Sequence, residues 1–105
     1  MVGRTPIAVT RAIRRLGEDL GTWRRLRHLT AVQVADRAGV ARETVLRVEN
    51  GANTSLESVL RIARALGVLD ELAEALDPYA TDIGRLRANE TLPERVRGSK
   101  ARRKP

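Results

Sequence analysis

The sequence predicts an all-α protein, and both its composition and its apolar pattern favour that fold class. Ala, Leu and Val dominate the apolar residues, which make up 42% of the 105 positions. No stretch alternates β-branched and polar residues as an amphipathic strand would, whereas apolar residues recur at three- and four-residue steps. Because Phe is absent and the only aromatic residues are Trp23 and Tyr79, the core must be aliphatic.

The first predicted helix begins near Thr10 and ends near His28. Gly17 and Gly21 lie inside it. Each glycine should weaken the helix by about 1 kcal/mol relative to alanine, so packing against another element must hold it. Its apolar face consists of Ile13, Leu16, Leu20, Trp23 and Leu26.

Two short helices are predicted next, over 31–38 and about 41–50. Thr30 supplies an N-cap oxygen to the first of them. Gly39 can adopt the left-handed conformation of a tight corner, and the small side chain of Ala35 lets the two backbones approach. This is helix-turn-helix geometry, which leaves the second helix standing out from the surface. An ordinary helical hairpin is the alternative interpretation.

A fourth helix is expected to begin at about Leu56 and to end before Gly67. A fifth, from about Asp70 to Leu76, should stop before Pro78, which cannot continue a helix. The chain is therefore expected to have four parts: a flexible arm (1–9), a helix-turn-helix domain (10–76), a dimerisation or partner-binding extension (77–97) and a disordered basic tail (98–105).

The net charge of +7 is unevenly distributed. Residues 1–29 contain seven basic and two acidic side chains, residues 70–92 two basic and six acidic, and residues 93–105 six basic and one acidic. Two basic ends favour a polyanionic partner, with nucleic acid first and an anionic membrane second. No apolar stretch approaches the ~20 residues of a membrane span, and no signal-peptide core is present, so we expect a cytoplasmic protein.

Catalysis is disfavoured by the residue types available. Cysteine is absent and His28 is the only histidine, with no carboxylate cluster or glycine-rich phosphate loop around it. We therefore expect no enzyme activity, no cofactor and no metal. RNA binding would use the basic ends but lacks aromatic stacking residues. A purely protein-binding module would not need both Arg42 and Arg47 on an exposed face.

One set of motifs spans the two short helices and their flanks: Leu29-Thr30, Val34-Ala35, Gly39-Val40, Val45, Val48, Glu49-Asn50-Gly51 and Ser55-Leu56-Glu57. In combination these motifs resemble the Cro/C1-type (xenobiotic-response-element) helix-turn-helix family over about residues 13–69. The resemblance implies a five-helix fold, here with a C-terminal extension, whose second and third helices read double-stranded DNA in a repressor.

Base-reading positions implied by the resemblance are Ala41, Arg42, Glu43 and Arg47. Arginine can present a fork to guanine O6 and N7, and glutamate can accept from cytosine N4. Pairing of Glu43 with Arg47 at i, i+4 is an alternative use of both side chains.

The resemblance also implies which residues hold the reading helix in position. Arg24 would pair with Glu49 and connect the first helix to the end of the reading helix, while Ala35 and Gly39 shape the turn. Ala31 stands where the family often has glutamine, and alanine cannot make the DNA contact of a glutamine side chain. The phosphate-facing positions implied are Thr30, Ala31, Thr44 and Asn50.

The extension holds more apolar residues than a five-helix domain can bury, which favours an interface. Its Asp-Pro-Tyr, Gly-Arg-Leu-Arg-Ala and Leu-Pro-Glu-Arg-Val-Arg segments are similar to tails of regulators paired with HipA-like kinase toxins. That similarity implies a dimeric autorepressor and antitoxin of a type II toxin-antitoxin operon; a stand-alone repressor is the alternative. The predicted dimer or partner interface is Leu72, Leu76, Tyr79, Ile83 and Leu86.

Overall fold

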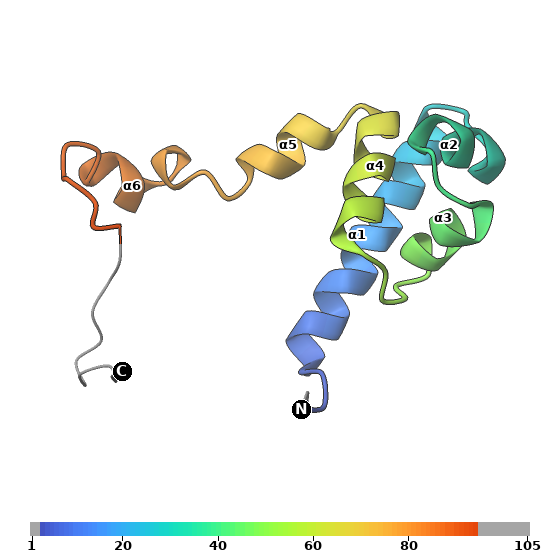
Figure 1. The fold of residues 1–105 in the computed structure, drawn as a ribbon, viewed down its shortest axis with the longest axis horizontal. Helices are drawn as coiled ribbons and strands as arrows, with labels where there is room; N and C mark the ends of the chain where they lie inside the picture. The colour runs from blue at the N-terminus through green and yellow to red at the C-terminus, as the bar shows by residue number, and fades with distance from the viewer. Residues whose placement is uncertain (1–2, 95–105) are drawn as a thin grey trace. The chain divides into compact units, whose positions relative to one another are not determined.

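The computed structural model describes residues 3–94, and all regular secondary structure in that range is helical (Figure 1). The all-α prediction is therefore confirmed. The predicted basic tail at 98–105 lies outside the described residues. The chain divides into two compact units, Met1–Ala75 and Leu76–Pro105. Its elements are α1 (Ile7–Leu26), α2 (Ala31–Ala38), α3 (Arg42–Glu49), α4 (Leu56–Leu66), α5 (Leu69–Glu74), the 3-10 helix η1 (Pro78–Ala80) and α6 (Asp82–Leu86).

The first helix starts earlier than its sequence pattern indicates. α1 begins at Ile7 rather than near Thr10, so helix takes over the last three residues of the predicted arm, 1–9. The carbonyl of Pro6 accepts hydrogen bonds from the amides of Val9 and Thr10, each at 3.1 Å. Proline suits a helix start because its fixed φ matches the helix and its missing amide would have no partner there.

An aliphatic core joins α1, α2, α3 and α4, as the composition predicted. Ile62 and Leu66 of α4 are each 1% exposed, whereas Leu56, the first residue of α4, is 71% exposed. Trp23 and Tyr79 both remain more than two-fifths exposed. The buried residues are Leu20, Val34, Ala35, Ala38, Val45, Val48, Ile62, Ala63, Leu66 and Val68.

The turn between α2 and α3 has the geometry that its glycine suggested. Gly39 lies in the left-handed region with φ of 72° and ψ of 34°. The amides of Gly39 and Val40 both donate to the carbonyl of Ala35, at 2.9 and 3.1 Å. Ala35 is buried beneath this corner, and a larger side chain there would separate the two helices.

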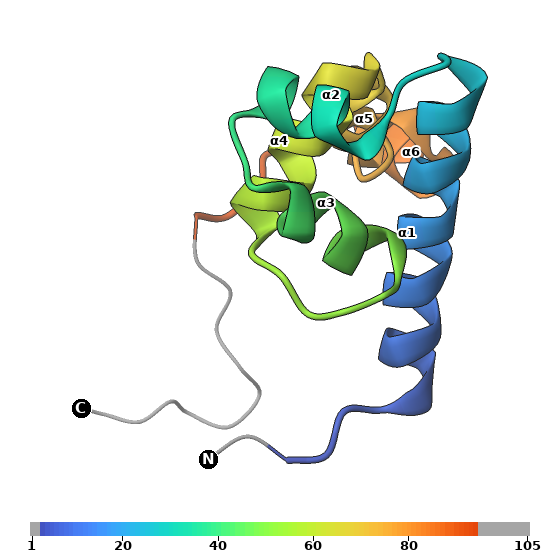
Figure 2. The ribbon, with the colours of Figure 1, turned by 90° about the vertical axis from the view of Figure 1, so that its right-hand side faces the viewer.

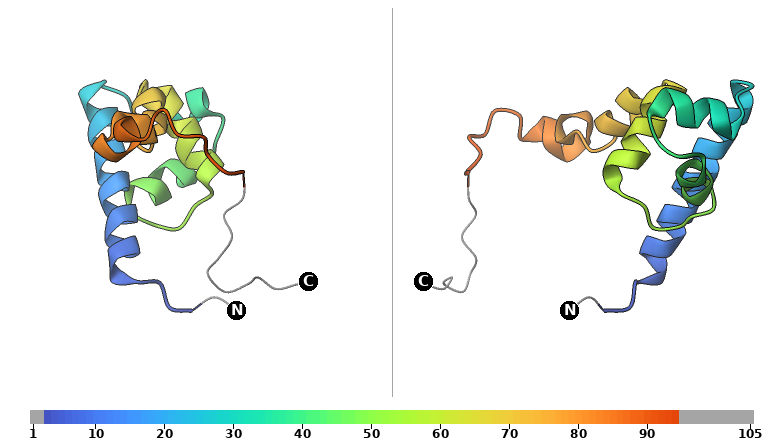
Figure 3. Two further views of the ribbon diagram at one scale, coloured as in Figure 1. Left: turned by 90° about the vertical axis from the view of Figure 1, so that its left-hand side faces the viewer. Right: turned by 45° about the vertical axis from the view of Figure 1, so that its right-hand side comes forward.

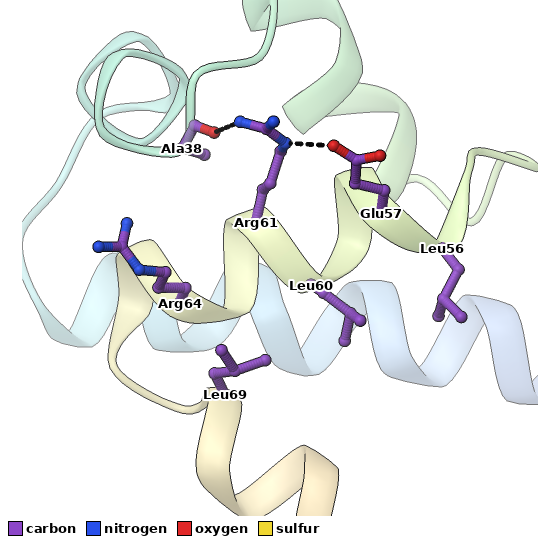
Figure 4. A pocket seen from close by; sticks show the side chains of 7 residues that line it. All are labelled: Ala38, Leu56, Glu57, Leu60, Arg61, Arg64 and Leu69. Atoms are coloured by element: carbon purple, nitrogen blue, oxygen red, sulfur yellow. Dashed lines mark hydrogen bonds and ion pairs between the residues drawn. The ribbon is translucent and has the colours of Figure 1, made fainter.

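An arginine of α4 holds the end of α2 in place (Figure 4). Arg61 Nη1 donates to the carbonyl of Ala38 at 3.3 Å, and Arg61 Nε donates to Glu57 at 2.9 Å. The carbonyl of Ala38 lies in the last turn of α2, where no helical amide is available to bond it. Arg61 thus supplies a donor from α4 and links the end of α2 to the fourth helix.

Gly17 and Gly21 let α3 approach α1 closely. Both glycines are buried, and a Cβ at residue 17 would overlap the backbone carbonyl oxygen of Val48. A Cβ at residue 21 would lie 3.1 Å from the Glu49 carboxylate. The contact with α3 offsets the cost of glycine within a helix, as the sequence required.

α1 consequently turns a different side inward from the one its apolar pattern marks. Only Leu20 of that apolar face is buried, while Leu16 is 40%, Trp23 41% and Leu26 63% exposed. The buried side of α1 carries the two glycines and Leu20. An apolar stripe is therefore left largely uncovered along α1.

Replacing Gly17 with alanine should destabilise the protein. Alanine improves helix propensity by about 1 kcal/mol, but its methyl group must push the α3 backbone away. Overpacking of this kind costs roughly 1–3 kcal/mol. We expect a lower midpoint in thermal unfolding followed by circular dichroism.

Gly21→Ala is the matched comparison, because its methyl group would lie 3.1 Å from the Glu49 carboxylate, whereas at residue 17 it would overlap a backbone atom. Its unfolding midpoint should change much less than that of Gly17→Ala. Equal midpoints for the two variants would contradict the close approach of α3 at Gly17.

Candidate nucleic-acid interface

α3 presents one polar face to solvent and buries the other. Val45 and Val48 are 0% and 5% exposed and fix the inner side of the helix. Ala41, at its N-cap, and Arg42 and Glu43, in its first turn, are all exposed. Figure 2 shows α3 beside α1, with α2 above it. The inner side of α3 is therefore packed against the core, while its outer side is exposed to solvent.

Arg24 and Glu49 connect α1 to the last turn of α3 by a bidentate ion pair. Arg24 Nε donates to Glu49 Oε2 at 2.7 Å and Nη2 donates to Oε1 at 3.1 Å. The two side chains are only 18% and 13% exposed. The hydrogen bond to Glu49 raises the pKa of Arg24 against the opposing effect of burial. Arg24 Nη1 also donates to the carbonyl of Leu29 at 3.0 Å, so this one side chain orients both ends of the reading unit.

The candidate base-reading side chains differ in how they are held. Arg47 Nη2 donates to the carbonyl of Asn53 at 3.0 Å, which connects α3 to the loop before α4. None of the ion pairs within residues 3–94 includes Arg42, and none joins Glu43 to Arg47. The alternative pairing of Glu43 with Arg47 is thus absent from the described structure. Arg42 is exposed at the start of α3, whereas Arg47 would have to leave Asn53 to reach a base.

The N-terminus of α2 is capped as its sequence indicates. Thr30 Oγ1 accepts from the amide of Gln33 at 3.1 Å, and the Thr30 amide donates to Gln33 Oε1 at 2.8 Å. This leaves the Thr30 hydroxyl proton available to an outside acceptor such as a phosphate. Ala31 and Thr44 are half-buried, while Asn50, the C-cap of α3, is exposed.

One arginine of α1 lies near this face, although it is not among the site residues that the resemblance implies. The Cα of Arg14 lies 3.1 Å from where a Cβ of Gly51 would be, directly after α3. Arg14 is exposed, so a positive charge lies beside the end of the reading helix. No spacing rule could indicate this neighbour, because the contact joins residues far apart in the chain.

The predicted interface residues fall into both units of the chain. Leu72 is half-buried against the core of the first unit. The remaining four belong to the second unit and are exposed: Leu76 89%, Tyr79 46%, Ile83 72% and Leu86 85%. Within that unit, Thr81 caps α6 by accepting from the amide of Gly84 at 3.0 Å.

Residues suited to metal binding do not gather in residues 3–94, where no group of three or more His, Asp or Glu side chains could hold an ion. His28 is exposed and occupies the left-handed region, with φ of 57°, in the turn between α1 and α2. None of the helices in the described range is long and apolar enough to cross a bilayer.

Comparison with known proteins identifies the family. A helix-turn-helix family model matches residues 20–72, which covers α2, α3, α4 and the Arg24–Glu49 pair. A comparison with curated proteins finds no match. With the reading unit, its buried anchor and its open face in place, the chain belongs to the Cro/C1-type helix-turn-helix family of DNA-binding transcriptional regulators.

Proposed function

We propose that the protein is a dimeric, sequence-specific repressor of its own operon and the antitoxin of a type II toxin-antitoxin pair in the cytoplasm. The observation that carries the DNA-reading part is α3 itself. Its inner face is fixed by Val45 and Val48, and its outer face exposes Arg42 and Glu43 in the first turn. Helix-turn-helix proteins read base edges with the first turns of this helix.

Each candidate residue of α2 and α3 has a proposed role on DNA. Arg42 would donate to guanine, and Glu43 would accept from cytosine. Ala41 would contact a thymine methyl group or allow close approach to the groove, and Arg47 would read a base after leaving the carbonyl of Asn53. Thr30, the amide of Ala31, Thr44 and Asn50 would contact phosphates and set the register without reading sequence.

A dimer supplies the specificity that one short helix lacks. A single reading helix contacts a few base pairs, whereas two helices related by a twofold axis read half-sites about 34–36 Å apart. A repressor of this kind needs a palindromic site in the DNA upstream of its own gene.

The exposed apolar residues of the second unit support a protein partner. Leu76, in the turn before η1, and Ile83 and Leu86, on α6, are each more than 70% exposed. Solvent-exposed apolar residues in such density favour a binding surface. We propose a HipA-like kinase toxin as the partner; a stand-alone repressor is the alternative, in which the same residues complete the homodimer.

Operator binding tests the proposed function directly. The protein should give a discrete gel-shift complex with its own upstream DNA that survives an excess of random duplex. Raising the salt concentration should weaken all binding, because arginines release phosphate counterions. Binding that competitor removes entirely would contradict sequence-specific reading.

Arg42→Ala should weaken operator binding by about 1–3 kcal/mol and relax the preference at one base pair. The effect should be much smaller on random duplex, where Arg42 has no matching base to bind. Arg64→Ala, which removes an exposed arginine from α4 instead, is the matched control. Equal effects on operator and random DNA would show that Arg42 binds phosphate only.

Deleting residues 98–105 removes four basic side chains. If they bind phosphates, the plot of log affinity against log salt should become shallower by about 0.9 for each phosphate that is no longer neutralised. Operator and random duplex should weaken equally. A tail of equal length made of Gly and Ser is the control, and an unchanged slope would exclude phosphate binding by the tail.

The antitoxin proposal is tested by co-expression with a HipA-like kinase encoded beside this gene. The two proteins should purify together, and serine at Leu76, Ile83 and Leu86 should abolish that without reducing operator binding. Because these side chains are exposed, the first unit should remain folded. A repressor that binds its operator but never retains the kinase would favour the stand-alone alternative.

A further inference from the structure

Arg61 of α4 contacts the corner between α2 and α3. Its Nη1 donates to the carbonyl of Ala38 at 3.3 Å and lies 3.1 Å from where a Cβ of Gly39 would be. Glu57, one turn earlier on α4, accepts from Arg61 Nε at 2.9 Å and fixes the direction of the guanidinium. α2 and α4 lie next to each other in both views of Figure 3. Arg61 therefore touches two successive residues where α2 ends.

This corner determines where α3 begins. Only Gly39, Val40 and Ala41 separate the end of α2 from the start of α3. The amides of Gly39 and Val40 are bonded to the carbonyl of Ala35, within α2. The carbonyl of Ala38 is bonded instead to a side chain of α4. The direction in which the chain leaves α2 thus depends on α4 as well as on α2 itself.

The start of α3 depends on the corner more than its end does. Ala41 stands at the N-cap but has no side-chain oxygen to accept from the first amides of the helix, as Ser, Thr, Asp or Asn would. At the other end, Glu49 accepts both donors of the Arg24 fork. Because α3 has only eight residues, its own hydrogen bonds do not keep its first turn in place.

We infer that Arg61 is a positioning residue for the first turn of α3, where Arg42 and Glu43 lie, and that it acts through the carbonyl of Ala38 and not by touching DNA. Arg24 of α1 then holds the start of α2 and the end of α3, and Arg61 holds the end of α2 and the start of α3. This role rests on the proposed function, because its effect on DNA reading requires that the first turn of α3 meets base edges.

The exposure of this contact favours positioning over stability. The side chains of Arg61 and Glu57 are 51% and 75% exposed, and an exposed i, i+4 ion pair adds little to the free energy of unfolding. A bidentate contact with a base is far more sensitive, since displacing a binding group by about 0.5 Å already impairs its geometry. Loss of Arg61 should therefore reduce operator reading more than it lowers the unfolding midpoint.

Arg64 provides a matched control on the same helix. It lies three residues after Arg61 and is also exposed. In Figure 4 dashed lines join Arg61 to Ala38 and Glu57, whereas none joins Arg64 to another residue drawn. Alanine at either position removes one positive charge from α4. A difference between the two variants therefore reports the contact with the corner and not the net charge.

Hydrogen exchange of the full chain tests the positioning role without DNA, because α3 has reporter amides at both ends. The amides of Thr44 and Val45 donate to the carbonyl of Ala41 in its first turn, at 3.0 and 3.3 Å. The amide of Asn50 donates to the carbonyl of Leu46 at the opposite end, at 3.0 Å. Local opening at one end speeds exchange there alone, whereas global unfolding speeds exchange at both ends.

Arg61→Ala should speed exchange at Thr44 and Val45 by about 5- to 10-fold, the size expected for one charge-assisted hydrogen bond at a partly exposed site. Exchange at Asn50 should stay as in the wild type, and Arg64→Ala should change neither end. Unchanged exchange at Thr44 and Val45 would overturn the inference. Faster exchange at all three amides would overturn it too, because Arg61 would then only add stability.

Gel shifts test the consequence for DNA reading. Arg61→Ala should lower the ratio of operator affinity to random-duplex affinity by about 5- to 10-fold, and Arg64→Ala should leave that ratio unchanged. Arg61→Lys keeps the charge but cannot present two fixed donors to Glu57 and Ala38, so its ratio should fall as well. A wild-type ratio in Arg61→Lys would show that Arg61 acts only as a charge near phosphate.

Glu57→Ala separates positioning from electrostatics, because the two predict opposite results. Removing a negative charge should strengthen binding to any duplex if only charge matters. If Glu57 directs Arg61 onto Ala38, the ratio of operator to random affinity should fall even though binding to random duplex strengthens. A Glu57→Ala protein that keeps the wild-type ratio would contradict the role of this pair.

The two experiments distinguish failure of this role from failure of the proposed function. If exchange responds as expected but the wild type does not prefer its operator to random duplex, Arg61 positions α3 and the proposed function is wrong. If the wild type prefers its operator and the Arg61 variants keep both that preference and wild-type exchange, the proposed function stands and the positioning role is wrong.

Discussion

The contact between α1 and the last turn of α3 is the interaction on which the rest of the structure depends. α3 is eight residues long, too short to be stable as an isolated helix. Its end lies directly on the backbone of α1 at Gly17, and Glu49 accepts both donors of the Arg24 fork. Packing fixes how far α3 stands from α1, and the ion pair fixes its rotation. A reading helix needs both to be defined before it meets DNA.

The same contact explains why a partly buried ion pair is used where apolar side chains could also pack. A buried pair adds little net stability over a well-packed apolar replacement, yet losing one partner costs about 3–5 kcal/mol. Arg24 also donates to the carbonyl of Leu29, just before the cap of α2. One arginine therefore orients the end of α3 and the start of α2 together. Positioning of both helices, more than added stability, is what this residue contributes.

Local signals in the sequence were sufficient to predict the helix-turn-helix pair. They could not predict contacts between segments that are distant in the chain. The capping box at Thr30, the left-handed corner at Gly39 and the buried Ala35 all follow from residue chemistry over a few positions. Which side of a helix is buried cannot be predicted from a few neighbouring residues. From the sequence, Gly17 and Gly21 were expected only to weaken the helix. The apolar residues beside them were expected to form its buried face. The bond from Arg47 to Asn53 and the approach of Arg14 to Gly51 likewise depend on chain segments meeting in space.

The two sides of α1 show why its apolar pattern does not indicate which side is buried. The side with Gly17 and Gly21 contacts α3, and Leu20 lies beside it in the core. The apolar side, about 100° around the axis, stays 46% exposed at Val9, 40% at Leu16 and 41% at Trp23. The close contact with α3 therefore decides which side of α1 faces inward, although the other side carries the larger apolar side chains.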